Sequence, residues 1–394
     1  MLLRLPLLPH ILFMAIYLLC LISISFPIRS TLLYSEDEIV YIEAGLRYVT
    51  GVPPRDVNFE HPPLAKYLIG LAYSIGLNRY ASSLSVLITA LFAMAILRSL
   101  GVGLSMSFVV SLAFVFDMLT LSMSRLMLLD VYMTMFMVIA IYLYLRWLKH
   151  GGDIYLYSSA IFMGFAIASK LTATYVALAI VFHMLIDHDI QNKFRRLLSY
   201  LLIASTVFIL SFTADAIYGG LEYLALHIIE MCSYMLYRHS FSPIIAFNGF
   251  LTFLTKLEIW RYGGEITVVP YNESVLRYVE AHGLFIKFNP LLGSFIWPIA
   301  FAVALHTVFS WRRISSAERV VVCCCLAACI SLVHGNIFWY YYIATPLLYV
   351  CLGMKGSRVL SLASLGLNVA QLILVSILLP TVSKYFTLTL LLST

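Results

Sequence analysis

The chain has 394 residues, of which 62% are hydrophobic and 11% are charged, and its mean hydropathy is +0.95. A soluble domain usually carries about a quarter charged residues, so a chain this apolar cannot cover its folded surface with polar groups. Lipid must therefore be its solvent. The modest net charge of +6 gives no reason to expect nucleic acid as a partner.

Long apolar segments recur along the chain. Each has about the 20 residues that a helix needs to cross a bilayer, and the apolar residues are continuous rather than alternating, which favours helices over barrel strands. A shorter apolar segment, 64–78, is expected to lie at the interface or to dip partway into the membrane. The sequence predicts an all-α polytopic membrane protein with about eleven transmembrane helices, at 10–28, 80–98, 104–122, 126–146, 154–170, 171–187, 197–214, 291–311, 317–334, 337–353 and 358–378.

Two long segments, about 29–79 and 215–290, separate the predicted spans and hold most of the acidic residues. Because cytoplasmic loops carry an excess of Lys and Arg, we predict a cytoplasmic N-terminus and both long loops outside the cytoplasm. We interpret residues 1–394 as a single integral membrane domain in the plasma membrane, with no soluble domain. The connections on the predicted cytoplasmic side carry Arg4, Arg98, Arg146, Lys149, Lys193, Arg195, Arg196, Arg312, Arg313, Arg319, Lys355 and Arg358.

Several further features are interpreted as structural. The first span lacks a small-residue cleavage site, so we expect it to stay uncleaved. The cysteines lie almost all in apolar runs without metal-ligand spacing, which is typical of small buried hydrophobic residues. His183 and His306 lie within predicted spans and are expected to be satisfied core histidines. In the second long loop, apolar residues recur at helical spacing over 221–238 and predict a helix along the membrane surface.

The first long loop begins with a capping pattern. Ser35 followed three residues later by Glu38 predicts a helix that runs to about Tyr48 and stops near Gly51. One interpretation is a well-capped surface helix whose acids complement the helix dipole. The other is that Asp37 or Glu38 is a catalytic carboxylate, since a helix N-terminus favours the ionised form that a general base needs.

Further motifs follow in a consistent order. After Asp37-Glu38 the chain has the sequence His-Pro-Pro-Leu-Ala-Lys at 61–66, Ser-Arg-Leu-Met-Leu-Leu-Asp at 124–130, a Gly-rich stretch ending in Ser-Lys at 164–170, and an aromatic segment at 338–346. In this order and placement the chain resembles the protein O-mannosyltransferases, dolichyl-phosphate-mannose-dependent members of the GT-C glycosyltransferase superfamily. It departs from their pattern at Ala65, where the family usually has Gly, and at Tyr341, where it has His.

The resemblance implies inverting transfer of mannose or a similar hexose from a polyprenyl (dolichyl) phosphate sugar to Ser/Thr hydroxyls of secreted or membrane proteins. Such a displacement needs one base opposite the leaving group and cations beside the departing lipid phosphate. No metal ligands are assigned, and a divalent cation stays an open alternative to charge compensation by Lys and Arg. The implied site residues are Asp37 and Glu38 for catalysis, Arg125, Lys66, Lys170 and His61 for the donor phosphate, and Glu60, Asp130 and Tyr341 for substrate contacts.

Other interpretations of the same residues stay open at this point. Arg125 could extend to the interface and pair with Asp130 or Asp117, and Lys170 could have a similar structural role. An aminoarabinose-transferase-like enzyme, with a lipid or glycan acceptor, would use the same kind of donor. A transporter is disfavoured because the acids cluster on one face and no internal repeat is visible. A non-catalytic membrane partner, with 36–48 as a capped surface helix only, is the remaining class.

Overall fold

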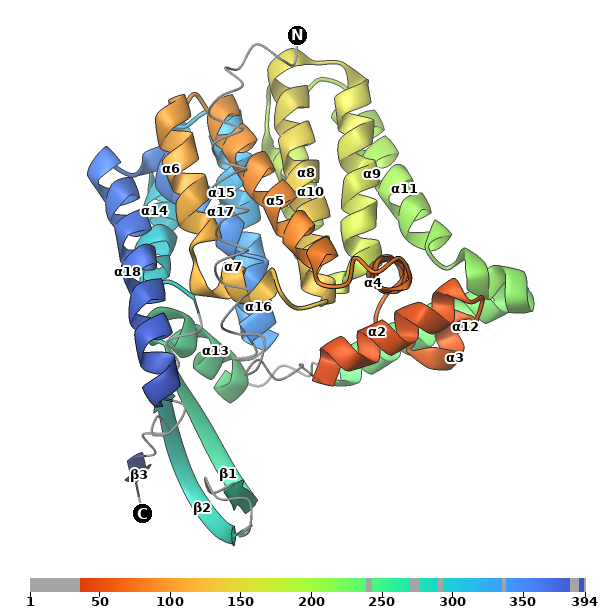
Figure 1. The fold of residues 1–394 in the computed structure, drawn as a ribbon. Coiled ribbons are helices and arrows are strands. Elements are labelled where there is room, and N and C mark those ends of the chain that lie inside the picture. Colours follow the sequence, from red (N-terminus) through yellow and green to blue (C-terminus); the bar gives the residue numbers. More distant parts are fainter. Residues whose placement is uncertain are drawn as a thin grey trace.

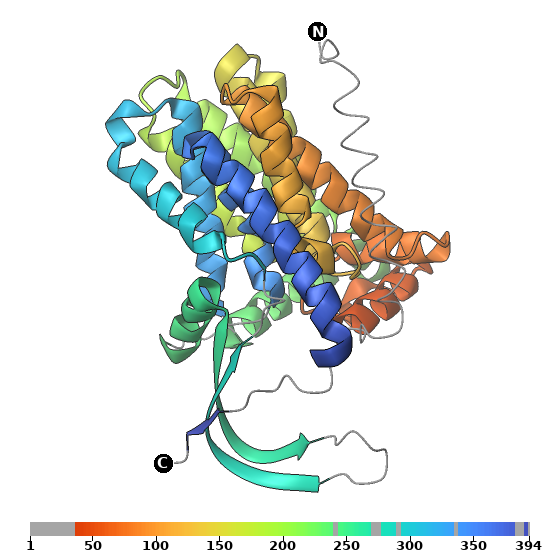
Figure 2. The ribbon, with the colours of Figure 1, turned by 60° about the vertical axis from the view of Figure 1, so that its left-hand side comes forward.

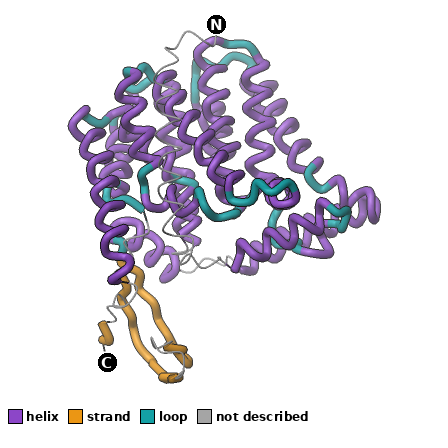
Figure 3. The backbone as a smooth tube through the Cα atoms, in the orientation of Figure 1, coloured by secondary structure: helices purple, strands orange, loops and turns teal. Residues whose placement is uncertain are grey.

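The computed structural model describes residues 36–238, 243–268, 277–288, 293–334, 338–382 and 390–392. Figure 1 shows a bundle of helices, with short helices lying across one end and a β-hairpin extending beyond that end. Helix dominates the described chain, as Figure 3 shows. The predicted span at 10–28 and the capping residue Ser35 lie outside the described residues.

The end of the bundle that carries the short helices is called the site end below. It is covered by α2 (Glu36–Val49), α3 (Pro54–Val57), α4 (Leu64–Ser74) and α12 (Thr213–Arg238). The two predicted long loops therefore meet at one end of the molecule. The backbone N–H of Arg55 and its side chain bond to Asp215 and Glu230, which fixes α3 against α12.

The bundle itself is built from helices of both halves of the chain. The N-terminal half supplies α5 (Tyr80–Ser99), α6 (Leu104–Val115), α7 (Met118–Met123), α8 (Leu129–His150), α9 (Asp153–Ser169), η1 (Leu171–Ala173), α10 (Thr174–Ile186) and α11 (Lys193–Leu210). The C-terminal half supplies α13 (Pro243–Thr255), α14 (Trp297–Phe309), η2 (Trp311–Arg313), α15 (Ser316–Cys329), η3 (Ile330–His334), α16 (Phe338–Tyr342), α17 (Thr345–Lys355) and α18 (Arg358–Val382).

The helices match the predicted apolar segments in order, but the count of eleven spans is not confirmed. Among the described residues, α5 and α8 are long and apolar enough to cross a membrane, and α11 with α12 adds a third candidate if that bent pair is one span. Several other apolar segments form shorter helices. The reason is visible at 104–122, where the carboxylate of Asp117 accepts the N–H groups of Leu119 and Thr120 and starts a new helix.

The helix predicted over 221–238 is confirmed as the main part of α12. Gly220 has φ of +76°, a conformation that a glycine adopts without strain, and it separates this part from the preceding turn. The axis of α12 is bent by 97° from that of α11, at the short break between Leu210 and Thr213. The helix therefore turns across the end of the bundle rather than continuing through it.

The all-α prediction is wrong in one segment. Strands β1 (Leu257–Val268) and β2 (Arg277–Phe288) pair antiparallel, and β3 (Leu390–Leu392) adds to β2. Figure 2 shows this hairpin projecting away from the helices. The second long loop contains enough β-branched and aromatic residues to pair with itself once it leaves the apolar body.

Helices α2 and α4 pack at a glycine–glycine contact. A Cβ atom on Gly45 would lie 2.3 Å from the carbonyl oxygen of Lys66, and one on Gly70 would lie 2.1 Å from the carbonyl oxygen of Gly45. Real side chains do not approach so closely. The two helices can therefore touch backbone to backbone, which brings the first turn of α2 close to the loops of the bundle.

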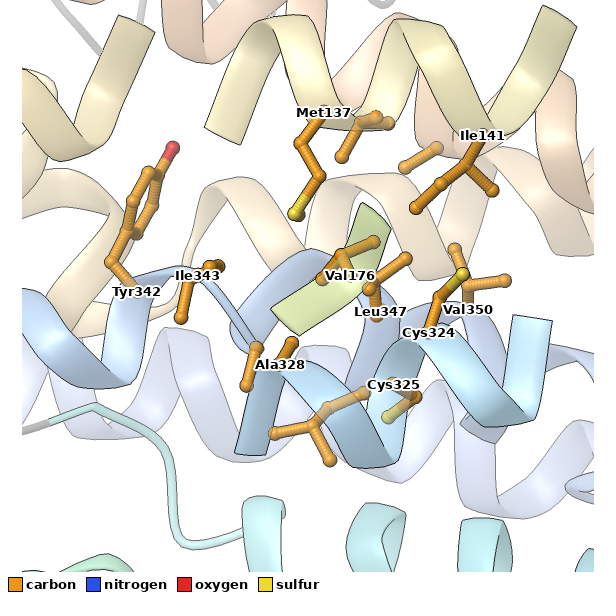
Figure 4. Packing of buried hydrophobic residues seen from close by; sticks show 14 of the residues in the cluster. Met137, Ile141, Val176, Cys324, Cys325, Ala328, Tyr342, Ile343, Leu347 and Val350 are labelled. Carbon is orange, nitrogen blue, oxygen red and sulfur yellow. The ribbon is translucent and has the colours of Figure 1, made fainter. Parts of the chain in front are cut away.

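Apolar side chains from both halves fill the centre of the bundle. Figure 4 shows Met137 and Ile141 of α8 facing Val176 of α10, with Leu347 of α17 between the layers. The prediction for the cysteines is confirmed for those that are buried here: Cys324, Cys325, Cys329 and Cys351. This core holds the bundle as one packed unit beneath the site end.

Candidate active site

The first turn of α2 is fastened to the bundle by Glu38. Its carboxylate is fully buried and accepts two hydrogen bonds from the guanidinium of Arg79, at 3.1 and 2.9 Å. It also accepts the backbone N–H of Met127 at 3.1 Å, in the loop between α7 and α8. Glu38 therefore joins three segments far apart in the sequence, and it positions its neighbour Asp37 beside the loop that carries Arg125.

Tyr41, one turn after Asp37, marks the centre of the site. Its phenol is buried, and the His61 ring packs edge-on against it with centroids 6.1 Å apart. Burial raises the pKa of Tyr41 well above its usual range, and the nearby charges of Asp37, Asp130 and Glu60 raise it further. Three predicted acidic site residues thus lie close to one phenol.

Asp130 and Lys170 form a buried ion pair. The Lys170 ammonium donates to both carboxylate oxygens, at 2.9 and 2.8 Å, and lies 4.8 Å from the ring centroid of Tyr340. Asp130 is in the first turn of α8, and Lys170 is the extended residue between α9 and η1. The pair lies near Asp37. Asp130 and Lys170, both predicted site residues, are therefore together in the structure, and each neutralises the charge of the other.

Lys66 has a different environment from the one predicted. Its ammonium is completely buried and donates to the carbonyl oxygens of Asn58 and His61, at 2.6 and 2.8 Å, and to the Tyr48 hydroxyl at 3.3 Å. Burial lowers its pKa to about 7, although Glu60 and Asp215 oppose the shift. With three acceptors around it, Lys66 organises the loop that presents Glu60 and His61.

The guanidinium of Arg125 can form further hydrogen bonds. One of its terminal nitrogens, Nη2, is buried and has no hydrogen-bond partner among the described residues. Burial and the adjacent Arg79 lower the pKa of this guanidinium to about 10, so it stays charged at neutral pH. The pairing of Arg125 with Asp130 or Asp117 is wrong, because Asp130 binds Lys170 and Asp117 binds Trp297 and Tyr349.

Tyr341 is not brought together with these residues. Its hydroxyl donates to the carbonyl oxygen of Gly249 at 3.1 Å, and its ring stacks on Trp297 at 6.0 Å. The adjacent Tyr340 contacts Lys170 instead. The aromatic segment at 338–346 therefore does reach the site, through the residue before the one predicted.

Three residues of the site were not predicted from the sequence: Tyr41, Arg79 and Tyr340. Tyr41 could have been found from its position four residues after Asp37, which puts both on one side of a helix. Arg79 precedes α5 without a motif, and its contact with Glu38 joins residues 41 positions apart. Nothing in the local sequence indicates such a pair.

The basic residues of the site are suited to binding an anion. Among the described residues, no group of three or more His, Cys, Asp or Glu side chains is placed to hold a metal ion. The cations Arg79, Arg125 and Lys170 lie instead around the start of α2. This arrangement can set one carboxylate, Asp37, against a negatively charged leaving group.

Part of the chain matches a known protein family. Residues 60–217 match the family described as dolichyl-phosphate-mannose-protein mannosyltransferase. The matched part includes Arg125, Asp130 and Lys170, while Asp37 and Glu38 precede it. No curated protein sequence matches the chain significantly.

Solved structures extend the likeness to nearly the whole chain. ArnT from Cupriavidus metallidurans bound to undecaprenyl phosphate has a TM-score of 0.58 at 16% identity, covering 96% of this chain and 66% of that one. Its apo state gives 0.55 at 17%, covering 94% and 63%. The Archaeoglobus fulgidus oligosaccharyltransferase AglB, with an inhibitory peptide and a dolichol-phosphate, gives 0.52 at 14%, covering 96% and 56%.

The chain has the GT-C glycosyltransferase fold. It spans about two thirds of the length of the ArnT chain. In this GT-C fold the described site end is formed by α2, α3, α4 and α12, together with the loops that precede α8 and η1.

Proposed function

We propose that this chain is an inverting glycosyltransferase that moves mannose or a similar hexose from a polyprenyl (dolichyl) phosphate donor to Ser/Thr hydroxyls of secreted or membrane proteins. The family match over residues 60–217 supports the sugar-transfer chemistry. The neighbours with bound undecaprenyl phosphate and dolichol-phosphate support a lipid phosphate as leaving group. The excess of basic residues in the short connections supports a site outside the cytoplasm, on a plasma-membrane protein with a cytoplasmic N-terminus.

The observation that carries the proposal is the position of Asp37, which lies near Tyr41 and Asp130 on a helix turn that Glu38 fastens to the loop carrying Arg125. Glu38 fixes the first turn of α2 to the Met127 backbone, two residues after Arg125. That turn carries the partly exposed Asp37 carboxylate, and the loop carries a guanidinium whose Nη2 has no partner among the described residues. A surface helix that was only well capped would not need a fully buried Glu38. The arrangement offers a base on one side and an anion-binding cation nearby.

The reaction can be written with these two groups. Asp37 takes the proton of the acceptor hydroxyl as the hydroxyl oxygen bonds to the anomeric carbon of the sugar. The bond from that carbon to the phosphate oxygen breaks, and its electron pair leaves on the lipid phosphate. Arg125 faces the charge that develops on that oxygen, which needs stabilisation more than it needs a proton. Lys66 and Glu38 act as positioning residues, and the Asp130–Lys170 pair lines the same space.

The substitution Asp37→Asn tests the proposal in the purified, lipid-reconstituted protein. We expect it to lower sugar transfer to a Ser/Thr peptide at least about 100-fold, because general-base catalysis commonly contributes that much. Glu43→Gln is the matched control, since Glu43 is an exposed acid of the same helix. Both variants should keep the thermal unfolding midpoint of the wild type. Undiminished transfer by Asp37→Asn would remove Asp37 from the mechanism, and transfer to a lipid acceptor alone would overturn the assignment of the acceptor.

A further inference from the structure

A cavity of about 300 Å³ lies at the end of the bundle opposite the site end. It is bounded by the last turn of α10, by η2 and by α15. His183 lies 13 residues after Lys170, so at the helical rise the cavity is about 20 Å from the candidate active site. The cavity is lined by His183, Ile186, Asp187, His188, Trp311, Arg312 and Arg319.

The positive charges of this cavity are not neutralised by ion pairs. Within the described residues, neither Arg312 nor Arg319 has a carboxylate within ion-pair distance. Arg319 donates from Nε to the carbonyl oxygen of Trp311 at 3.2 Å and lies 5.7 Å from the centroid of the Trp311 ring. In the part of the chain that the structure describes, its terminal nitrogens have no hydrogen-bond partner and can bind a ligand. The guanidinium is held in place by the indole, which favours planar recognition of an oxyanion.

The one acid in the lining is already occupied. The Asp187 carboxylate accepts the Ser316 hydroxyl and the backbone N–H of Asp189, the latter at 3.1 Å. His183 is held between the Tyr144 hydroxyl and the carbonyl oxygen of Ser316, at 3.0 Å each, as expected for a satisfied core histidine. These bonds stiffen the floor of the cavity and leave the two arginines to face its contents.

The N-terminus of α15 does not supply the binding capacity. Ser315 and Glu318 form a reciprocal capping box there, and Lys355 pairs with Glu318. The first N–H groups of this helix are therefore partly satisfied within the protein. An anion in the cavity would be bound by side-chain guanidinium groups.

Apolar side chains outside the cavity point to lipid as the source of the anion. On α10, Leu178, Phe182 and Leu185 follow at helical spacing and each is more than half exposed. At the end of α14, two residues before Trp311, Phe309 is 89% exposed. Such side chains suit acyl chains, while a tryptophan at this level suits the boundary between headgroups and hydrocarbon. A soluble phosphate would use the arginines but not this apolar surface.

We infer that this cavity binds the phosphate of an anionic membrane phospholipid, with Arg312 and Arg319 as its ligands and with the acyl chains along the exposed side chains of α10 and α14. The site lies in the leaflet opposite the one that faces the proposed sugar transfer. It is independent of that reaction, because none of its residues lies near Asp37 or Arg125.

Native mass spectrometry of the detergent-purified protein, titrated with dioleoylphosphatidylglycerol or dioleoylphosphatidylcholine, tests this inference. We expect one phosphatidylglycerol to bind at least tenfold more tightly than phosphatidylcholine. Arg312→Gln and Arg319→Gln should each remove most of this preference. Arg313→Gln is the matched control, since Arg313 is exposed and adjacent in sequence but does not line the cavity, and it should change the affinity less than twofold.

The other outcomes each decide against part of the inference. Equal loss in Arg313→Gln would show that the preference comes from general surface charge, and no preference in the wild type would overturn the site. Binding of glycerol 3-phosphate as tight as that of the lipid would assign the cavity to a soluble phosphate. Arg312 is exposed, so Arg312→Gln decides the question even if Arg319→Gln fails to fold.

Discussion

Two buried carboxylates of this protein are stabilised in opposite ways. Asp130 is neutralised by direct contact with the Lys170 ammonium at two oxygens. Asp117 accepts neutral donors, which are the Trp297 indole at 2.8 Å, the Tyr349 hydroxyl at 2.9 Å and the N–H groups of Leu119 and Ser294 at 2.9 and 3.2 Å. Its closest lysine, Lys256, lies over the Trp297 ring at 3.8 Å rather than on the carboxylate. We call these groups the Asp130 cluster and the Asp117 cluster.

The two clusters have different roles, because one belongs to the proposed active site and the other holds helices together. The Asp130 cluster lies beside Asp37 and Tyr41, where its paired charges set the electrostatics of the proposed site. The Asp117 cluster joins helices that are distant in sequence, and Asn368 of α18 extends it by donating to the Tyr349 hydroxyl at 2.6 Å and to the carbonyl oxygen of Ala113 at 2.7 Å. We interpret it as the element that fastens α14, α17 and α18 to α6 and α7.

Breaking the Asp130 cluster should have the largest effect. Lys170→Met leaves the Asp130 carboxylate buried and uncompensated, which commonly costs about 3–5 kcal/mol of folding stability. We expect a large fall in the thermal unfolding midpoint in detergent together with loss of sugar transfer. The double variant Lys170→Met/Asp130→Asn removes the orphaned charge and should recover more than half of the stability but none of the activity. A single variant as stable as the wild type would show that the pair is not buried as described.

Breaking the Asp117 cluster should cost stability but not catalysis. Asp117→Asn keeps the shape but replaces the charged acceptor of these hydrogen bonds, and hydrogen bonds to charged groups contribute about 1.5–3 kcal/mol each. Because the amide still accepts part of them, we expect a loss of about 2 kcal/mol. The turnover number of the folded fraction should stay within twofold of the wild type. A loss of turnover as large as that of Lys170→Met would place both clusters in the active site.

The same contrast explains how much could be predicted from the sequence. Asp37, Glu60, His61, Arg125, Asp130 and Lys170 stand in short local motifs, and the fold does bring them to one end of the bundle. The helix over 36–49, the helix after Gly220 and most helix boundaries also follow from local patterns of apolar and capping residues. These features depend on neighbours within one or two turns.

What could not be predicted depends on pairs that are distant along the chain. Trp297 and Tyr349 lie 180 and 232 residues from Asp117, and each looks like one more aromatic residue in an apolar run. Glu38 reads as a capping residue until Arg79 and Met127 meet it. The number of spans is not confirmed for a related reason, since polar side chains such as Asp117 interrupt apolar segments that look continuous by hydropathy.

Lys66 and Lys256 are both buried lysines, and they predict that the folding stability of the protein depends on pH. Burial lowers the pKa of each to about 7, from an ordinary value of 10.5. Between pH 7 and 10.5 the unfolded chain binds a proton that the native lysine does not, so stability should rise with pH, by at most about 1.4 kcal/mol per pH unit for each lysine. Below pH 7 this slope disappears.

Thermal unfolding midpoints measured from pH 6 to 9 check this dependence. Lys66→Met and Lys256→Met should each remove about half of the rise above pH 7, and Lys149→Met is the control because Lys149 is exposed at the opposite end of the bundle. A rise that survives in the double variant would have to come from other groups. Because Lys66 holds the loop of Glu60 and His61, its variant should also lower sugar transfer, which Lys256→Met should not.

Arg125 provides the smallest and most specific test of the proposed site. Arg125→Ala removes a guanidinium whose Nη2 has no partner among the described residues, so the folded protein loses few hydrogen bonds and its unfolding midpoint should change little. If Arg125 faces the phosphate, the KM for the polyprenyl phosphate sugar should rise three- to tenfold while the KM for the Ser/Thr peptide stays within twofold. Arg125→Lys keeps the positive charge but lacks the planar guanidinium with its paired N–H donors, and it should recover part of the affinity for the donor. Equal weakening for both substrates would instead give Arg125 a structural role, since a collapsed loop between α7 and α8 would release Glu38 and displace Asp37 for donor and acceptor alike.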